Sequence, residues 1–80
     1  MRYAVIPKDK ATEAGIALAG HFDFGNSIVV NERELMALNG MKADGLDEVA
    51  ARLGGELLRQ YQITDLIKQY EEEKENGESI

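Results

Sequence analysis

Residues 21–40, HFDFGNSIVVNERELMALNG, contain the turn, strand and helix signals that decide the fold. The dipeptide Gly25-Asn26 separates two extended runs, His21–Phe24 and Ser27–Val30. Glycine and asparagine tolerate the positive φ values that tight two-residue turns require. We therefore predict a β-hairpin in which alternation places Phe22 and Phe24 on one face and His21 and Asp23 on the other.

The second half of this stretch carries a helix start and a helix stop. Asn31 is a favourable N-cap, and Glu34 stands three residues later, where its carboxylate can reach back to the cap in a capping box. Gly40 is suited to the left-handed position that ends many helices. The pattern predicts a helix from Glu32 to about Asn39, followed by Met41 packing back on the last turn.

Toward the N-terminus, Tyr3–Ile6 is a β-prone run that Pro7 ends, because proline has no backbone N–H for a strand ladder. Proline also suits the first turn of a helix. We expect a short helix over Lys8–Ala14, closed by Gly15.

Toward the C-terminus, apolar residues between Leu46 and Leu53 recur at the spacing of one helix face. Gly54-Gly55 stops this helix, and Glu56–Arg59 is compatible with a short strand. A second apolar stripe, ending at Tyr70, predicts a last helix that starts between residues 60 and 64.

The three junctions between strand and helix share one spacing. In each, the last apolar strand residue is followed five and eight residues later by an apolar residue: Ile6, Ala11, Ala14; Val30, Leu35, Leu38; Leu58, Ile63, Leu66. The spacing predicts that the three junctions have similar structures.

These elements predict a small two-layer α/β (α+β) domain. We expect a mixed sheet of three to four strands with a β-hairpin, and three to four short helices mainly on one face. The compact domain spans 1–70. Residues 71–80 form an acidic tail with five glutamates and one lysine, which we expect to be frayed or disordered because carboxylates are unfavourable at the negative end of a helix.

The amino-acid composition argues against two classes of protein, nucleic-acid-binding proteins and membrane-spanning proteins. The chain has 80 residues, is 44% hydrophobic, lacks cysteine and carries a net charge of −6. Its basic residues are scattered singly, whereas phosphate-backbone binding needs them clustered, so we expect no nucleic-acid partner. No apolar run is long enough to cross a membrane, and the absence of cysteine in so small a domain favours a cytoplasmic location.

The one histidine lies two residues before a carboxylate, in His21-Phe22-Asp23. Metal sites and acid-base pairs use this spacing, but a metal centre needs more ligands than one histidine offers. The polar face of an exposed hairpin explains both residues. We therefore predict no catalytic, cofactor-binding or metal-binding residues and no cofactor.

Tyr3–Ile6 and Ile28–Val30 are apolar on both faces of the predicted strands. Short helices cover one face more readily than two, and an exposed apolar face commonly marks an interface. The leading hypothesis is a non-catalytic protein-interaction module, either a homodimer or the binder of another protein. The alternative is a small enzyme whose site forms at a dimer interface around His21 and Asp23, with Tyr3.

We predict that removing residues 76–80 changes the free energy of unfolding by less than about 0.5 kcal/mol, because a polar terminus buries little surface. Thermal melts of the shortened and full-length chains measure the difference. A larger loss would show that the end of the chain packs on the domain.

Overall fold

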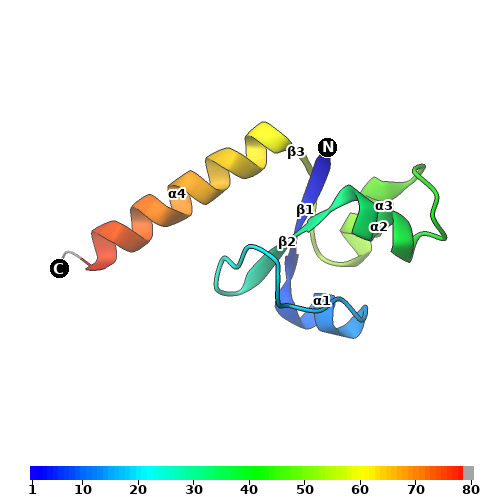
Figure 1. Cartoon of the computed structure of the whole chain (residues 1–80), viewed down its shortest axis with the longest axis horizontal. Helices are drawn as coiled ribbons and strands as arrows, with labels where there is room; N and C mark the ends of the chain where they lie inside the picture. Colours follow the sequence, from blue (N-terminus) through cyan, green and yellow to red (C-terminus); the bar gives the residue numbers. More distant parts are fainter. Residues whose placement is uncertain (79–80) are drawn as a thin grey trace.

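The computed structural model describes the backbone of residues 1–78 and the side chains of residues 1–75. Within this range the chain forms three strands and four helices (Figure 1): β1 (Arg2–Pro7), α1 (Lys8–Glu13), β2 (Ser27–Asn31), α2 (Glu32–Leu38), α3 (Leu46–Arg52), β3 (Leu57–Arg59) and α4 (Gln60–Glu78). The sheet order is β2-β1-β3. The predicted small α+β class is confirmed.

The sheet is antiparallel throughout, and the expectation of a mixed sheet is wrong in this respect. β1 pairs antiparallel with β2, Tyr3 opposite Asn31, and with β3, Tyr3 opposite Leu58. A parallel neighbour needs a crossover that returns along the whole strand, usually through a helix. The connection of residues 8–26 is long enough for such a crossover, but the N–H of Lys8 donates to the carbonyl of Asn26 at 3.0 Å, so the chain returns to the end of β1 that it left and β2 runs the opposite way.

The core lies between one face of the sheet and α1, α2 and α3. α2 and α3 lie side by side next to the sheet, and α1 packs at the far end of β1 (Figure 1). Alternate strand residues point toward them, and all the core residues are buried: Ala4, Ile6, Ile28 and Val30 from the sheet, and Ala11, Leu35, Leu46, Val49 and Ala50 from the helices. Three of the four helices thus cover one face, as predicted.

The second face of the sheet is covered in part by α4. Tyr3, Val5 and Val29 lie half-buried on this face, and Ile63 of α4 is buried above it. We expected this face to lie open for a partner, but the chain's own last helix supplies part of the cover. α4 continues to Glu78, through most of the segment expected to fray, whereas residues 79–80 lie outside the described chain.

The predicted capping box at the start of α2 is confirmed. The backbone N–H of Glu34 donates to Asn31 Oδ1 at 2.9 Å, and the N–H of Asn31 donates to Glu34 Oε1 at 3.4 Å. Gly40 takes the left-handed conformation, with φ 65°. The expected packing of Met41 is wrong, because its side chain is 70% exposed and only its backbone N–H reaches back, to the carbonyl of Met36.

The three strand-helix junctions are alike in one respect, since each strand runs into its helix without an intervening residue. The residue five positions after the last apolar strand residue is buried in all three junctions: Ala11, Leu35 and Ile63. The third position differs. Leu38 and Leu66 are 41% and 37% exposed, whereas Ala14 is half-buried.

The predicted hairpin is present, but its first arm is not a regular strand. Residues 21–24 join β2 through a single bridge between Asp23 and Ile28, flanked by hydrogen bonds from Phe24 N–H to Ser27 O and from Val29 N–H to Phe22 O. The side chain of Asp23 accepts the N–H of Gly25 at 2.6 Å. Such local side-chain bonds compete with a strand ladder, so the first arm remains irregular.

Gly55 is required by the close approach of the chain to β1. A Cβ atom at this position would lie 2.5 Å from the backbone oxygen of Val5, and backbone atoms in a sheet cannot give way. We predict that Gly55→Ala lowers the free energy of unfolding by about 1–3 kcal/mol, the usual cost of overpacking. Urea denaturation measures the loss, with Glu56→Ala at the exposed next position as the control. Equal stability of the two variants would contradict the steric argument.

Candidate functional site

His21 lies at the side of a cleft between α4 and the second face of the sheet. The cleft has a volume of about 380 Å³. Its floor is apolar, formed by Val29, Ile63 and Ile67, and Tyr3 lines it with His21. The structure thus brings together two of the three residues that the sequence nominated for an enzyme, His21 and Tyr3.

The partner of His21 is Glu34. Nε2 of His21 lies 2.5 Å from Glu34 Oε2, and the two side chains are 15% and 31% exposed. Oε1 of the same carboxylate accepts the backbone N–H of Asn31 in the capping box. Glu34 therefore joins the start of α2 to the loop that precedes β2, and this gives His21 a structural role.

The other ring nitrogen of His21, Nδ1, is buried and has no hydrogen-bond partner among the described residues. In the neutral ring Nε2–H donates to Glu34, and Nδ1 remains as an unused acceptor. Because Nδ1 is closed off, it cannot reach a substrate in the cleft. The ring offers a bound molecule neither of its nitrogens while the contact with Glu34 holds.

Asp23 is not part of this cleft. Lys8 Nζ lies 2.7 Å from its carboxylate, and the N–H of Gly25 bonds the same group. The hydrogen bond from Lys8, followed by that from Gly25, holds the pKa of the Asp23 carboxyl below its usual value. His21 and Asp23 thus have separate partners, and the structure does not assemble the acid-base pair of the enzyme hypothesis.

An aromatic cluster holds the middle of α4 to the loop before β2. The rings of Phe22 and Phe24 have centroids 4.9 Å apart, and Tyr70 packs edge-on against both, at 6.2 and 5.4 Å. Strand alternation predicted that the two phenylalanines share a face, and the helical stripe included Tyr70. Nothing in the sequence indicated that they meet.

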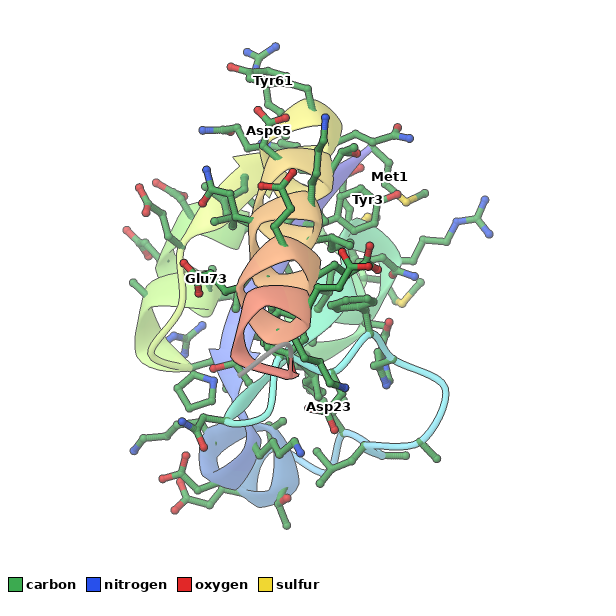
Figure 2. The ribbon with its side chains drawn as sticks, turned by 90° about the vertical axis from the view of Figure 1, so that its left-hand side faces the viewer. Met1, Tyr3, Asp23, Tyr61, Asp65 and Glu73 are labelled. Atoms are coloured by element: carbon green, nitrogen blue, oxygen red, sulfur yellow. The ribbon has the colours of Figure 1, made fainter. Side chains whose placement is uncertain are left out.

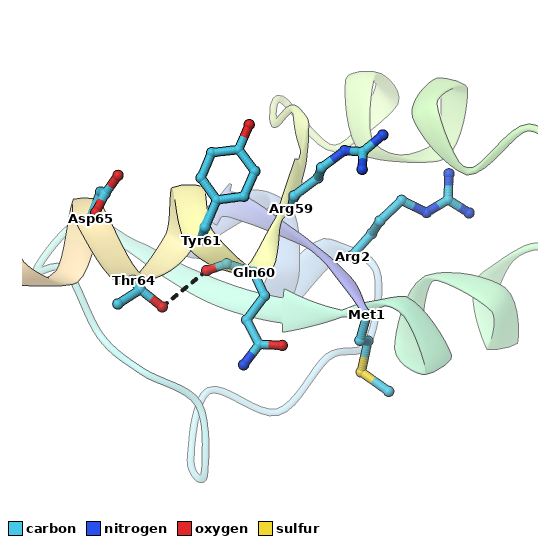
Figure 3. Close-up of a pocket in the computed structure, with 7 residues that line it drawn as sticks. All are labelled: Met1, Arg2, Arg59, Gln60, Tyr61, Thr64 and Asp65. Atoms are coloured by element: carbon cyan, nitrogen blue, oxygen red, sulfur yellow. Dashed lines mark hydrogen bonds between the residues drawn. The ribbon is translucent and has the colours of Figure 1, made fainter.

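A larger concave surface lies where β1 begins, β3 ends and α4 starts (Figure 3). It has a volume of about 870 Å³. We call it the arginine corner, lined by Met1, Arg2, Arg59, Gln60, Tyr61, Thr64 and Asp65. Arg2 and Arg59 stand far apart in the sequence, yet the sheet register places them directly opposite each other. Only the pairing of β1 with β3 makes them neighbours.

The arginine corner combines charge with exposed apolar surface. Met1 and Tyr61 are 55% and 65% exposed, and the two guanidinium groups extend to the same side (Figure 3). Arg2 Nε contacts Glu32 Oε1 at 2.7 Å. Arg59 forms no ion pair with any described side chain, so its guanidinium is available to an anionic group.

Neither concave region holds a group of metal ligands. Within the described residues no three side chains of His, Asp or Glu are placed to bind one ion. No helix in the described part of the chain is both long and apolar enough to span a membrane. Comparison with protein-family models, curated proteins and solved structures finds no match for this chain.

We predict that Glu34→Ala lowers the free energy of unfolding by about 1–3 kcal/mol, because it leaves a largely buried His21 and a helix N-cap without their acceptor. Glu34→Gln is the matched control. It keeps one acceptor oxygen and the capping-box geometry, and so retains most of the stability. Urea denaturation measures the free energy of unfolding of both variants. Equal losses would show that the acceptor oxygen kept by Glu34→Gln contributes little to stability.

Proposed function

We propose that this chain is a non-catalytic, cytoplasmic protein-interaction module that associates with itself as a homodimer. One observation carries the proposal: the last two turns of a long helix extend beyond the domain. α4 has 19 residues, and its C-terminal end points away from the sheet and the other helices (Figure 1).

The first part of α4 is held by packing. Ile63 is buried, Ile67 is half-buried, and Tyr70 contacts the two phenylalanines of the loop. Beyond Tyr70 the side chains of residues 71–75, which we call the acidic arm, are all exposed. No other described part of the chain buries these side chains.

Several effects disfavour a helical arm in isolation. Glutamates at the C-terminal end of a helix face the negative end of its macrodipole, and like charges four residues apart, such as Glu71 and Glu75, repel each other. Most helical stability in proteins comes from tertiary packing. A second protein molecule that offers positive charge would supply the missing stabilisation.

The site geometry supports this class of function over an enzyme. Nε2 of His21 is paired with Glu34, its Nδ1 is buried, and Asp23 is paired with Lys8, so His21 and Asp23 form no acid-base pair in the cleft. The exposed features are instead surfaces for contact: the acidic arm, the arginine corner, and the partly exposed side chains of Met1, Tyr61 and Leu66.

We expect sedimentation equilibrium at micromolar concentrations to give a mass twice the 8.9 kDa of the chain. Closed two-fold dimers are the commonest form of self-association. The fraction of dimer should rise with concentration by mass action. A single species of 8.9 kDa at every concentration would overturn the proposal.

A further inference from the structure

The arginine corner contains one guanidinium, that of Arg59, that pairs with no described carboxylate. Arg2 and Arg59 are directly opposite partners in the β1–β3 pair, and like charges at such positions destabilise an antiparallel sheet. Glu32 reaches only Arg2. Asp65 lines the same corner but forms no ion pair with Arg59. The corner therefore favours an anionic partner.

The chemistry of the corner suits carboxylates in particular. A guanidinium can bind a carboxylate through two parallel hydrogen bonds, and the exposed Tyr61 and Met1 can pack on the methylene groups of a glutamate side chain. The chain carries the matching surface itself. Glu71, Glu72, Glu73 and Glu75 stand exposed on the acidic arm, with Lys74 as the one base among them.

The acidic arm cannot reach the corner of its own molecule. The corner lies at the start of α4 and the arm toward its other end, with Tyr61 and Asp65 near one end of the helix and Glu73 well toward the other (Figure 2). Fourteen residues separate Arg59 from Glu73, which is about 21 Å along an α-helix. A contact between the arm and the corner must therefore join two molecules.

We propose that the acidic arm of each copy docks on the arginine corner of a second copy, with the two α4 helices antiparallel. This inference rests on the proposed self-association. The sequence spacing fits this arrangement. Tyr61 of the corner and Glu72 of the arm lie eleven residues apart, close to three helical turns, and therefore on one face of α4. An antiparallel pair that meets on this face places the corner of each copy opposite the arm of the other.

Charge reversal tests the docking. The corner variant carries Arg59→Glu, and the arm variant carries Glu72→Lys with Glu73→Lys. Each alone should weaken dimerisation by about tenfold or more, because each reverses charges at both contacts of a two-fold pair. An equimolar mixture of the two variants should recover dimer, since the heterodimer restores opposite charges at both contacts. Sedimentation equilibrium measures all three samples.

Matched controls exclude a general effect of net charge. Arg52→Glu and Glu13→Lys reverse exposed charges on α3 and α1, on the opposite side of the sheet, and should leave the dissociation constant unchanged. Circular dichroism spectra check that every variant is folded. Raising the salt concentration should weaken the wild-type dimer, because exposed ion pairs are screened.

The outcomes separate this inference from the function on which it rests. If wild type dimerises and both variants dimerise equally well, another surface mediates self-association and the inference is wrong. Failure of the mixture to recover dimer, although each variant alone is weakened and folded, also overturns it. If wild type is a monomer at every concentration, the proposed function fails and the docking fails with it.

Discussion

The pairing of β1 with strands on both of its sides is the constraint on which the rest of the structure depends. β1 is the only strand with two neighbours in the described sheet, and each of the other strands enters a helix directly at its end. The register of β1 with β2 and with β3 thus determines where α2 and α4 begin. The same pairing sets the approach of Gly55 to Val5, where a side chain has no room, and it places Arg2 opposite Arg59.

Local signals predicted the elements well, because their causes are local. The capping box of Asn31 and Glu34, the stop at Gly15 and the apolar stripe around Val49 depend on residues within one or two helical turns, and all of them lie where the sequence indicates. Strand direction was different. The connection of residues 8–26 is long enough to enter β2 from either end of the sheet, so no local signal decides whether β2 runs parallel or antiparallel to β1.

The candidate site was harder to predict than the fold, because its contacts join distant segments. His21 and Asp23 are neighbours in sequence, yet each found a partner elsewhere, Glu34 and Lys8. Arg2 and Arg59 are 57 residues apart and meet only through strand register. Composition alone therefore missed that Arg2 and Arg59 come together.

The distribution of charge along α4 bears on the kind of assembly that the proposed docking would form. A parallel pair of α4 helices would bring the two acidic arms side by side and the two arginine corners together, so both ends would repel. An antiparallel pair opposes unlike charges at both ends at once. Such a pair uses the arm and the corner of each copy, and leaves neither surface for a third molecule. A reciprocal contact of this kind closes on itself as a two-fold dimer, whereas a head-to-tail contact with unused ends would propagate into a filament. The restriction arises because the two complementary surfaces lie at opposite ends of one long helix, which prevents them from meeting within one molecule.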